Sequence, residues 1–454
     1  SLLRTAANSQ QRLIDQIDVR LGMVQVQQNE VPKALKTWQR LASTADNSAG
    51  NSAGNSASGV LMAREAIAAQ TLVDLWQTPP VLRPNTADLI NLNLTGWFRY
   101  SALERLYTLE DKSAQLSELR ADERAAAEKT LIQLSAVGLL PSFGALFGTA
   151  LLIALIGQRL LRGKDSLLAI PEGQWDVPWN WEVIWQVIVG GFLFVGQFVV
   201  PLVIGVLLAT VQSAGQVTSE GASGLIDGMA LGDLTSHVAA SLISLQASGL
   251  AMIGSVLGLS SRGKALYSLG SYLLMAAGTL TVLYYSVRAY LPLSKAWFPV
   301  KLGGKWPLWG FGSYLVALPL MLSVSLLNQQ IWQGQGGNNP ILQIVLDERD
   351  PLALGMFLFT AAVAAPVFEE ILFRGFLLPS LTRYLPIWGA IGLSSLIFAA
   401  AHLSFSEVLP LTVLGSILGF AYVRSRNLLS SILLHSTWNS VTMIGLFLLG
   451  SGSR

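Results

Sequence analysis

The sequence predicts an all-α protein: a polytopic membrane helix bundle of about eight transmembrane helices, preceded by a soluble helical domain. Composition supports the membrane part, because 52% of the 454 residues are hydrophobic and only 12% are charged, roughly half the charged share of an ordinary soluble domain. Charge distribution supports the division, because residues 1–130 are mixed and polar whereas the chain from 131 onward is mostly apolar. The formal net charge of +2 offers no basic footprint for nucleic acid. We therefore expect membrane lipid, and no nucleic acid, as a partner.

Reactive side chains are few. The chain has no Cys, which excludes disulfides, cysteine nucleophiles and thiolate metal sites. Its three histidines are His237, His402 and His435, so any histidine chemistry uses one of them. The chain begins with Ser and not Met, from which we expect an export signal or anchor upstream.

Residues 1–130 are expected to form the soluble helical domain. Apolar residues recur there at helical spacing: Leu13, Ile14, Ile17, Leu21 and Val24. The stretch from Gly22 through Ala34 to Trp38 resembles one tetratricopeptide unit, with a generic helical pair as the alternative. Repeated Asn-Ser-Ala-Gly at 47–59 indicates a flexible linker. Further helices are expected at 60–77, 96–110 and 114–130.

Apolar segments long enough to cross about 30 Å of hydrocarbon recur through the rest of the chain. The eight expected spans are 131–157, 183–211, 265–287, 308–328, 352–380, 386–403, 407–423 and 428–450. Residues 238–258 are a ninth candidate. Lys and Arg prefer the cytoplasmic ends of spans, so the positions of the basic loops indicate whether this segment crosses the membrane.

If the chain crosses the membrane eight times, the basic residues near the span ends all fall on one face, whereas nine crossings would divide them between both faces. Those residues are Arg159, Arg162, Lys164, Arg288, Lys295, Lys301, Lys305, Arg383, Arg424 and Arg426. We therefore expect 238–258 to be re-entrant or interfacial. Residues 1–130 would then lie on the non-cytoplasmic side of the membrane.

The 352–380 span contains three charged residues, Glu369, Glu370 and Arg374. Each costs about 2.5–3.5 kcal/mol at mid-membrane on insertion scales, so we expect them to be functional. Glu370 and Arg374 are four residues apart on one helix face and can pair. Glu369 points about 100° away from that pair, and an unpaired carboxylate in an apolar span is suited to act as a general base. The alternative is a structural network in which all three charges pack helices together.

Two later spans carry polar residues at helical spacing. Phe398 and His402 are four residues apart in Phe-Ala-Ala-Ala-His. His435 and Asn439 are four residues apart in His-Ser-Thr-Trp-Asn. At about 1.5 Å per residue, the three spans bring these groups and Glu369 to one layer near mid-membrane.

Small residues and a proline surround this layer. Gly415 and Gly419 form a G-x-x-x-G pair that allows two helices to approach closely. Pro366 has no N–H, so it leaves a backbone carbonyl free and can kink the helix that carries Glu369. We expect tight helix packing around the polar groups.

Together these motifs resemble the CAAX-protease and bacteriocin-processing (CPBP, Abi) family of intramembrane glutamate endopeptidases, which includes the eukaryotic Ras-converting CAAX prenyl endopeptidase. The matching residues are Glu369-Glu370-Ile-Leu-Phe-Arg374, Phe398-x-x-x-His402 and His435-x-x-x-Asn439, in that order and all in apolar spans. The resemblance covers roughly residues 265–450. Trp-Gln-Gly-Gln-Gly-Gly at 332–337 and Leu-Leu-Pro-Ser-Leu-Thr-Arg at 377–383 look most like the cyanobacterial and plastid branch.

The resemblance implies a role for each motif residue. Glu369 looks like the base that activates water, and His402 like the residue that holds or polarises that water. His435 and Asn439 look like the donors that stabilise the oxyanion of the tetrahedral intermediate. The supporting residues are Glu370, Arg374 and Phe398. No cofactor is expected; the alternative is zinc at Glu369, His402 and His435, which are ligand types of catalytic zinc but follow no known local zinc spacing.

The resemblance also divides the chain and suggests its location. Residues 1–130 are the soluble domain, 131–264 are accessory helices with the non-spanning segment, and 265–454 are the protease core. We expect an integral membrane protein of a cyanobacterial or plastid membrane, plasma or thylakoid. Its expected substrate is a peptide or membrane protein.

Two other functions compete with proteolysis. One is a non-proteolytic membrane scaffold or assembly factor, in which the amino-terminal domain binds a protein partner and the motif residues are a structural relic. The other is a transporter with a proton relay at mid-membrane. A transporter predicts inverted repeats, which the two halves do not show.

Overall fold

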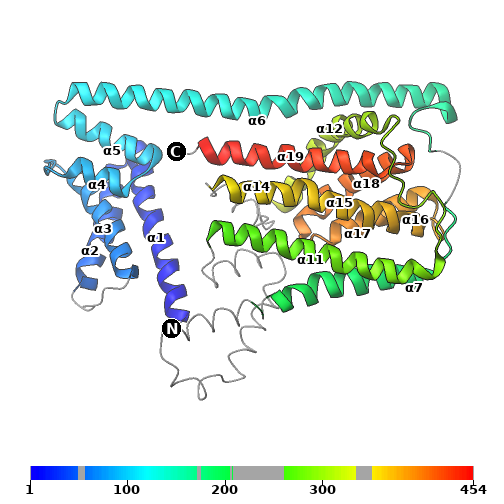
Figure 1. The fold of residues 1–454 in the computed structure, drawn as a ribbon. Helices are drawn as coiled ribbons and strands as arrows, with labels where there is room; N and C mark the ends of the chain where they lie inside the picture. The colour runs from blue at the N-terminus through cyan, green and yellow to red at the C-terminus, as the bar shows by residue number, and fades with distance from the viewer. Residues whose placement is uncertain are drawn as a thin grey trace, which may run out of the picture. The chain divides into compact units, whose positions relative to one another are not determined.

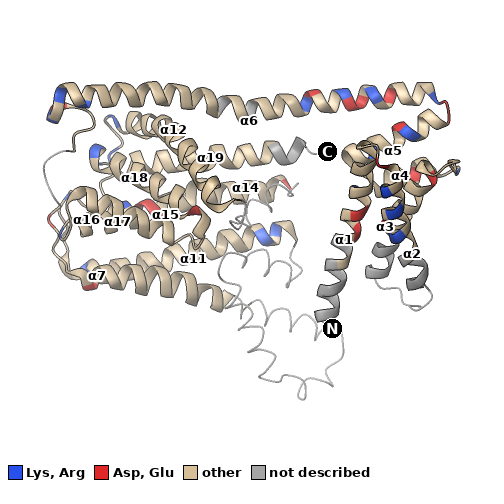
Figure 2. Cartoon of the chain, turned by 180° about the vertical axis from the view of Figure 1, so that it is seen from behind, with Lys and Arg blue, Asp and Glu red and all other residues tan. Residues whose placement is uncertain are grey.

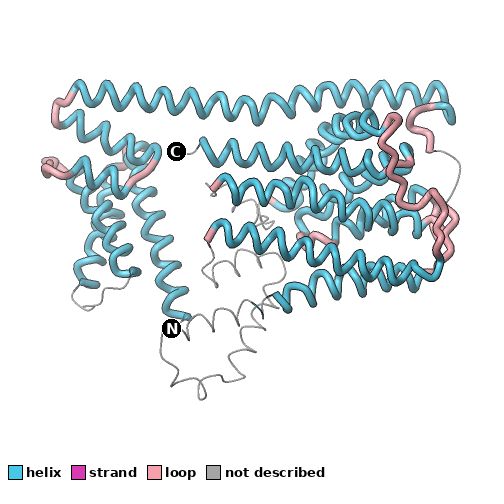
Figure 3. The backbone as a smooth tube through the Cα atoms, in the orientation of Figure 1, coloured by secondary structure: helices cyan, strands magenta, loops and turns pink. Residues whose placement is uncertain are grey.

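The computed structural model describes residues 2–49, 57–170, 175–204, 207, 260–333 and 350–452. Within these residues every regular element is a helix and no strand is present (Figure 3). This confirms the all-α class. The chain separates into two compact units, Ser1–Leu134 and Ser135–Ser451, each with an apolar core of its own.

The amino-terminal unit packs its helices around one apolar core. Its helices are α1 (Leu2–Gln27), α2 (Val31–Ala49), α3 (Ala57–Trp76), α4 (Thr86–Asn93), α5 (Gly96–Leu109) and the first part of α6 (Ser113–Arg162). Buried Trp38, Leu72 and Leu103 bring α2, α3 and α5 together. Helix α4 is an addition to the expected elements. Helices α2 and α3 extend into both ends of the expected linker at 47–59, and residues 50–56 lie outside the described part of the chain.

Helices α1 and α2 form a hairpin around Trp38. The Trp38 indole N–H donates to the Val19 carbonyl at 3.1 Å. Gly22 makes room for the ring, because a Cβ at this position would lie 2.2 Å from Trp38 Nε1. The spacing that resembles a tetratricopeptide unit thus corresponds to a tightly packed helical pair.

One apolar stripe of α1 is not part of that core. Its side chains are between 38% and 61% exposed, and they are Ile14, Ile17, Leu21 and Val24. The core side of α1 is formed instead by Val19 and Met23, which are buried. Helical spacing correctly predicted the helix, but the stripe faces outward.

The carboxy-terminal unit is a bundle of apolar helices (Figure 1). It contains the apolar part of α6, α7 (Trp181–Trp185) with η2 (Gln186–Val199), α11 (Ser261–Val287), α12 (Trp306–Trp332), α14 (Pro351–Phe359) continuing to α16 (Leu378–Leu381), α17 (Ile387–Ala400), α18 (Val408–Ser425) and α19 (Leu428–Gly452). Six helices of the described residues are long and apolar enough to span a membrane. The other two of the eight expected spans correspond to α19, which has 25 residues and carries His435 and Asn439, and to α17.

Helix α17 is shorter than expected. Its 14 residues reach only about 21 Å, too little to cross the hydrocarbon region. It ends at Ala400, and Leu403 has a φ of 54°, in the left-handed region that terminates helices. The expected span over 386–403 is therefore wrong at its carboxy-terminal end, because the helix stops at Ala400. His402 lies in the turn that follows the helix.

Lys and Arg gather at one end of the bundle (Figure 2). The basic residues of the expected cytoplasmic face lie near the ends of α6, α11, α16 and α18 or before the start of α12. At the other end, α11 begins with Arg262 and Lys264. The ninth candidate span, 238–258, lies outside the described residues.

Two packing features position the polar residues. Helix α18 contacts α17 closely at its two glycines, where an added Cβ would lie 3.0 Å from Ser395 at Gly415 and 3.3 Å from Ile391 at Gly419. The helix that carries the acidic pair alternates between forms: π-helical η4 (Thr360–Ala364), α15 (Ala365–Glu369) and π-helical η5 (Glu370–Leu377). π-Helical turns often occur at functional sites because they change the direction of side chains.

Candidate active site

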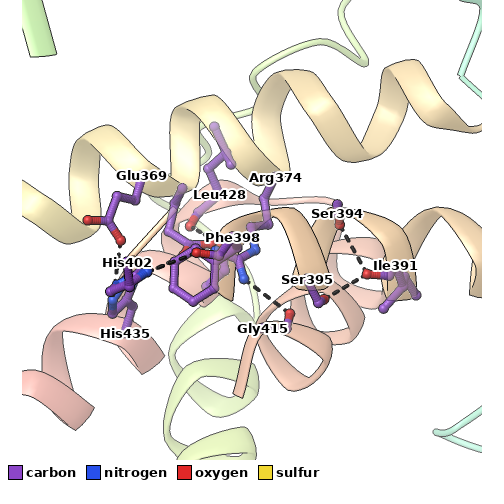
Figure 4. A network of polar contacts seen from close by, with 12 residues as sticks. Glu369, Arg374, Ile391, Ser394, Ser395, Phe398, His402, Gly415, Leu428 and His435 are labelled. Carbon is purple, nitrogen blue, oxygen red and sulfur yellow. Dashed lines mark hydrogen bonds and ion pairs between the residues drawn. The ribbon is translucent and has the colours of Figure 1, made fainter. Parts of the chain in front are cut away.

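Glu370 and Arg374 form an ion pair that is closed to solvent. Arg374 Nη1 donates to Glu370 Oε1 at 2.7 Å, and neither side chain is more than 1% exposed. Arg374 Nη2 donates to the Gly415 carbonyl at 3.1 Å, and the guanidinium lies 4.4 Å from the Phe398 ring centre (Figure 4). The pair therefore ties η5 to both α17 and α18.

Glu369 has different surroundings. Its Oε1 accepts a hydrogen bond of 3.0 Å from the hydroxyl of Tyr272 on α11. Its Oε2 is buried but has no hydrogen-bond partner among the described residues. The side chain is 14% exposed, and no Lys or Arg of the described chain pairs with it. One oxygen is thus fixed by a neutral group, and the other remains available.

His435 lies between the two carboxylates. Its Nδ1 is 2.9 Å from Glu370 Oε1, and its Nε2 is 3.9 Å from Glu369 Oε2. An ionised carboxylate only accepts hydrogen bonds, so we infer that Nδ1 carries the hydrogen donated to Glu370. Nε2 is then a donor only when the ring is protonated. With a protonated His435, the four groups Glu369, Glu370, Arg374 and His435 sum to zero charge.

Phe398 packs against both imidazoles of the site. Its ring centre is 4.8 Å from that of His402 and 5.8 Å from that of His435. His402 Nδ1 is 2.8 Å from the Phe398 carbonyl. Because a carbonyl only accepts, His402 donates from Nδ1, and in the neutral ring Nε2 is an acceptor. The His402 side chain is exposed, and no contact with Glu369 is seen within the described residues.

Asn439 binds a carbonyl that Pro366 leaves free. The Ala365 N–H donates to the Thr360 carbonyl, and this hydrogen bond spans one residue more than the corresponding bond in an α-helix. The next carbonyl in that pattern, Ala361, would need an N–H from Pro366, which has none. Asn439 Nδ2 donates to the Ala361 carbonyl at 2.7 Å instead. An amide nitrogen carries two hydrogens, so one remains for another acceptor.

The zinc alternative places a metal ion at Glu369, His402 and His435. Glu369 Oε2 and His435 Nε2 are 3.9 Å apart. Among the described residues no group of three His, Asp or Glu is placed to hold a metal ion. Zinc and the absence of any cofactor both stay predictions.

Three contributions to the site could not be found from the motifs. Tyr272 is 97 residues from Glu369 and is one of four tyrosines in α11, and no neighbouring residue in the sequence marks it as part of the site. The carbonyls of Ala361 and Gly415 are backbone groups, for which the only signals are Pro366 and the glycine itself. All three depend on which helices become neighbours.

Comparison with known proteins gives the site a family context. Residues 351–441 match the family model described as Type II CAAX prenyl endopeptidase Rce1-like. Over 145 residues the chain is 28% identical to Membrane-embedded CAAX protease MroQ of Staphylococcus aureus (strain USA300), which covers 31% of this chain and 56% of that relative. The chain thus spans about half the length of this curated relative. No solved structure matches the chain.

The fold and the site define a polytopic helical membrane protein with a buried carboxylate and histidine site. Its carboxy-terminal part contains an Rce1-like domain, and all seven motif residues from Glu369 to Asn439 lie inside the matched range. The expected family resemblance is confirmed for this part of the chain. The two matches are described as a CAAX prenyl endopeptidase and a CAAX protease. The cyanobacterial and plastid branch stays a prediction.

Proposed function

We propose that the protein is a membrane-embedded endopeptidase that hydrolyses a peptide bond with a water activated by Glu369. One observation carries the proposal. Glu369 Oε2 is buried without a hydrogen-bond partner among the described residues, 3.9 Å from His435 Nε2, inside the Rce1-like range. The proposed substrate is a peptide or a segment of a membrane protein.

In the proposed reaction Glu369 Oε2 takes a proton from water, and the water oxygen attacks the substrate carbonyl. Tyr272 orients the carboxylate through Oε1, which directs Oε2 toward the water. His402 Nε2 accepts the other hydrogen of the same water, because Nδ1 is already donated to a backbone carbonyl. The proton held by Glu369 then passes to the leaving amine.

The oxyanion of the tetrahedral intermediate requires hydrogen-bond donors. Asn439 supplies its second amide hydrogen, the first being bound to the Ala361 carbonyl. His435 supplies Nε2–H when its ring is protonated, and its Nδ1–H is held by Glu370. Arg374 fixes Glu370 and so acts on the reaction only through His435.

Reconstitution of the full chain in liposomes tests this function. The protein is incubated with a library of membrane peptides, and products are identified by mass spectrometry. Products that form with the wild type and are absent with Glu369→Gln support the proposal. An identical product set from both proteins would refute it. A zinc chelator is added in a parallel arm: the glutamate mechanism predicts unchanged cleavage, whereas loss that added zinc restores favours the zinc alternative.

A second candidate is the non-proteolytic scaffold with a protein partner at the amino-terminal unit. The exposed stripe of α1, Ile14, Ile17, Leu21 and Val24, favours it, because apolar helix faces commonly bind proteins. Complementation of a deletion strain separates the two functions. A scaffold predicts rescue by Glu369→Gln and failure of Ile17→Glu, and an endopeptidase predicts failure of Glu369→Gln.

The proposed location is a cyanobacterial or plastid membrane, plasma or thylakoid, with the amino-terminal unit on the non-cytoplasmic side. The gathering of Lys and Arg at one end of the bundle supports this orientation. Proteolysis of oriented vesicles checks it. Digestion of the amino-terminal unit from the cytoplasmic side would contradict the orientation.

A further inference from the structure

A basic cavity of about 500 Å³ lies at the end of the membrane unit where α6 and α18 end and α17 begins. This volume is within the range of small-molecule sites. Its lining includes Arg159, Lys164, Asp165, Ser166, Trp388 and Arg424. None of these residues belongs to the site around Glu369, so the cavity is separate from the proposed chemistry.

The charge of the cavity favours an anion. Three lining side chains are cationic and one, Asp165, is anionic, which leaves a net charge of +2. Arg424 Nε donates to the Leu167 carbonyl at 2.9 Å, and Arg159 donates to the Gly163 carbonyl. Each guanidinium is thus anchored by one bond and retains further N–H groups. Planar guanidinium forks of this kind bind phosphate oxygens in pairs.

Ser166 gives an independent sign of a ligand. Its side chain is 1% exposed and lines the cavity, yet its hydroxyl has no hydrogen-bond partner among the described residues. A buried hydroxyl without a partner costs stability unless something binds it. An anionic oxygen in the cavity would accept this hydrogen bond.

The surroundings indicate that the anion belongs to a lipid. Leu160 and Leu161, next to the cavity residue Arg159, are 80% and 89% exposed and give acyl chains an apolar surface. Trp388 is 60% exposed, and tryptophan is enriched at the headgroup level of membranes. Basic pockets between membrane helices bind anionic headgroups.

We propose that this cavity binds a phosphate group carried by the headgroup of an anionic phospholipid. Arg159, Lys164 and Arg424 supply the charge, and Ser166 supplies a neutral donor. Bound lipid would fix the loop after α6 to the end of α18, because Leu167 already connects them. Such binding stabilises the folded unit by mass action.

The test uses the purified full chain in a neutral detergent. Its melting temperature is measured during titration with phosphatidylglycerol, with phosphatidylcholine as the lipid control and inorganic phosphate as the free-anion arm. Phosphatidylglycerol is expected to raise the melting temperature at a concentration at least about tenfold lower than inorganic phosphate, and phosphatidylcholine is expected to have no effect. An equal response to phosphatidylglycerol and phosphate would overturn the lipid assignment.

Substitutions distinguish lipid binding in the cavity from general attraction to a basic surface. Arg159→Gln and Lys164→Gln should each weaken the apparent affinity by about tenfold, the usual loss for one charge-assisted hydrogen bond. Lys295→Gln, which removes an exposed charge outside the cavity at the same end, should leave it unchanged. Equal weakening in all three variants would show non-specific attraction and overturn the proposal.

Ser166→Ala keeps the test valid if a charge variant does not fold. The substitution removes a hydroxyl that has no described partner, so the lipid-free melting temperature should stay unchanged or rise. The increase caused by phosphatidylglycerol should become smaller. An increase equal to that of the wild type would contradict the role of Ser166 in the site.

Discussion

Glu369 and Glu370 are consecutive residues on one helix, but they meet opposite surroundings. Glu370 is fully buried, and its Oε1 contacts both Arg374 and His435. Glu369 is partly exposed, and its Oε1 contacts only the neutral Tyr272 hydroxyl. Both leave Oε2 without a hydrogen bond among the described residues, so the difference lies in charge compensation and access.

The contrast shows how one helix gives identical side chains different roles. Neighbouring residues point about 100° apart, so the two carboxylates face different helices. Glu370 contacts His435 on α19 and has its charge balanced by Arg374 on its own helix, whereas Glu369 contacts Tyr272 on α11. We therefore propose a structural role for Glu370 and the chemical role for Glu369.

The largest expected effect on stability comes from Arg374→Met, which leaves the Glu370 charge buried without its guanidinium. Breaking a buried pair costs about 3–5 kcal/mol, and thermal unfolding in detergent measures the loss. The double variant Arg374→Met with Glu370→Gln should be less destabilised than the sum of its parts, because no unpaired charge remains. A loss of stability under about 1 kcal/mol for Arg374→Met would contradict the structural role of the Glu370–Arg374 pair.

Asn439→Ala should slow turnover by about a hundredfold or more, the usual effect of losing one oxyanion donor. It should also cost about 1 kcal/mol of stability, because the Ala361 carbonyl loses its partner. Pro366→Ala provides the control, since it supplies the missing backbone N–H. The double variant should regain stability but not turnover. Recovery of both would show that Asn439 acts through packing alone.

Tyr272→Phe should lower kcat about five- to tenfold and leave KM and the melting temperature nearly unchanged. The ring keeps its edge contact with Phe368, at 6.0 Å between ring centres, while the hydrogen bond to Glu369 is lost. Tyr267→Phe is the matched control on the same helix, because its hydroxyl has no described bond to the site. A similar kcat in both variants would show that Tyr272 does not position Glu369.

Arg262 and Asp350 form the exposed counterpart of the buried pair, and their effect should be the smallest. The hydrogen bond from Arg262 lowers the pKa of Asp350 below its usual value. A lowered pKa gives stability that is present above the unfolded pKa of about 3.9 and is lost as pH falls through the folded pKa. Asp350→Asn should therefore change the melting temperature slightly at neutral pH and not in strong acid. An effect that salt does not reduce would contradict a surface pair.

The sequence predicted the parts of the site that lie within single helices. Four-residue spacing alone pairs Glu370 with Arg374, and hydrophobic length alone places seven of the eight expected spans on long helices, six of which are apolar enough to span a membrane. The same rules fail where a helix ends earlier than its apolar sequence suggests. His402 was expected inside a span, but Leu403 adopts a positive φ and the helix ends before it.

Contacts between helices could not be predicted from the sequence, because they depend on which helix faces pack together. Tyr272 and Glu369 come together only when α11 packs against the helix of the acidic pair. The bond between Asn439 and Ala361 required both a π-helical turn and a proline at the right place. Pro366 was visible as a helix disturbance, but the sequence did not show which side chain would satisfy the free carbonyl.

The most direct test of the account compares Glu369→Gln with Glu370→Gln in the same lipid, measuring both peptide cleavage and melting temperature. Glu369→Gln should abolish cleavage while the melting temperature holds or rises, because a buried amide costs less than a buried carboxylate. Glu370→Gln should lower the melting temperature, because Arg374 loses its counter-charge. Cleavage by Glu369→Gln, together with a stable but inactive Glu370→Gln, would contradict the account and assign the base to the other carboxylate.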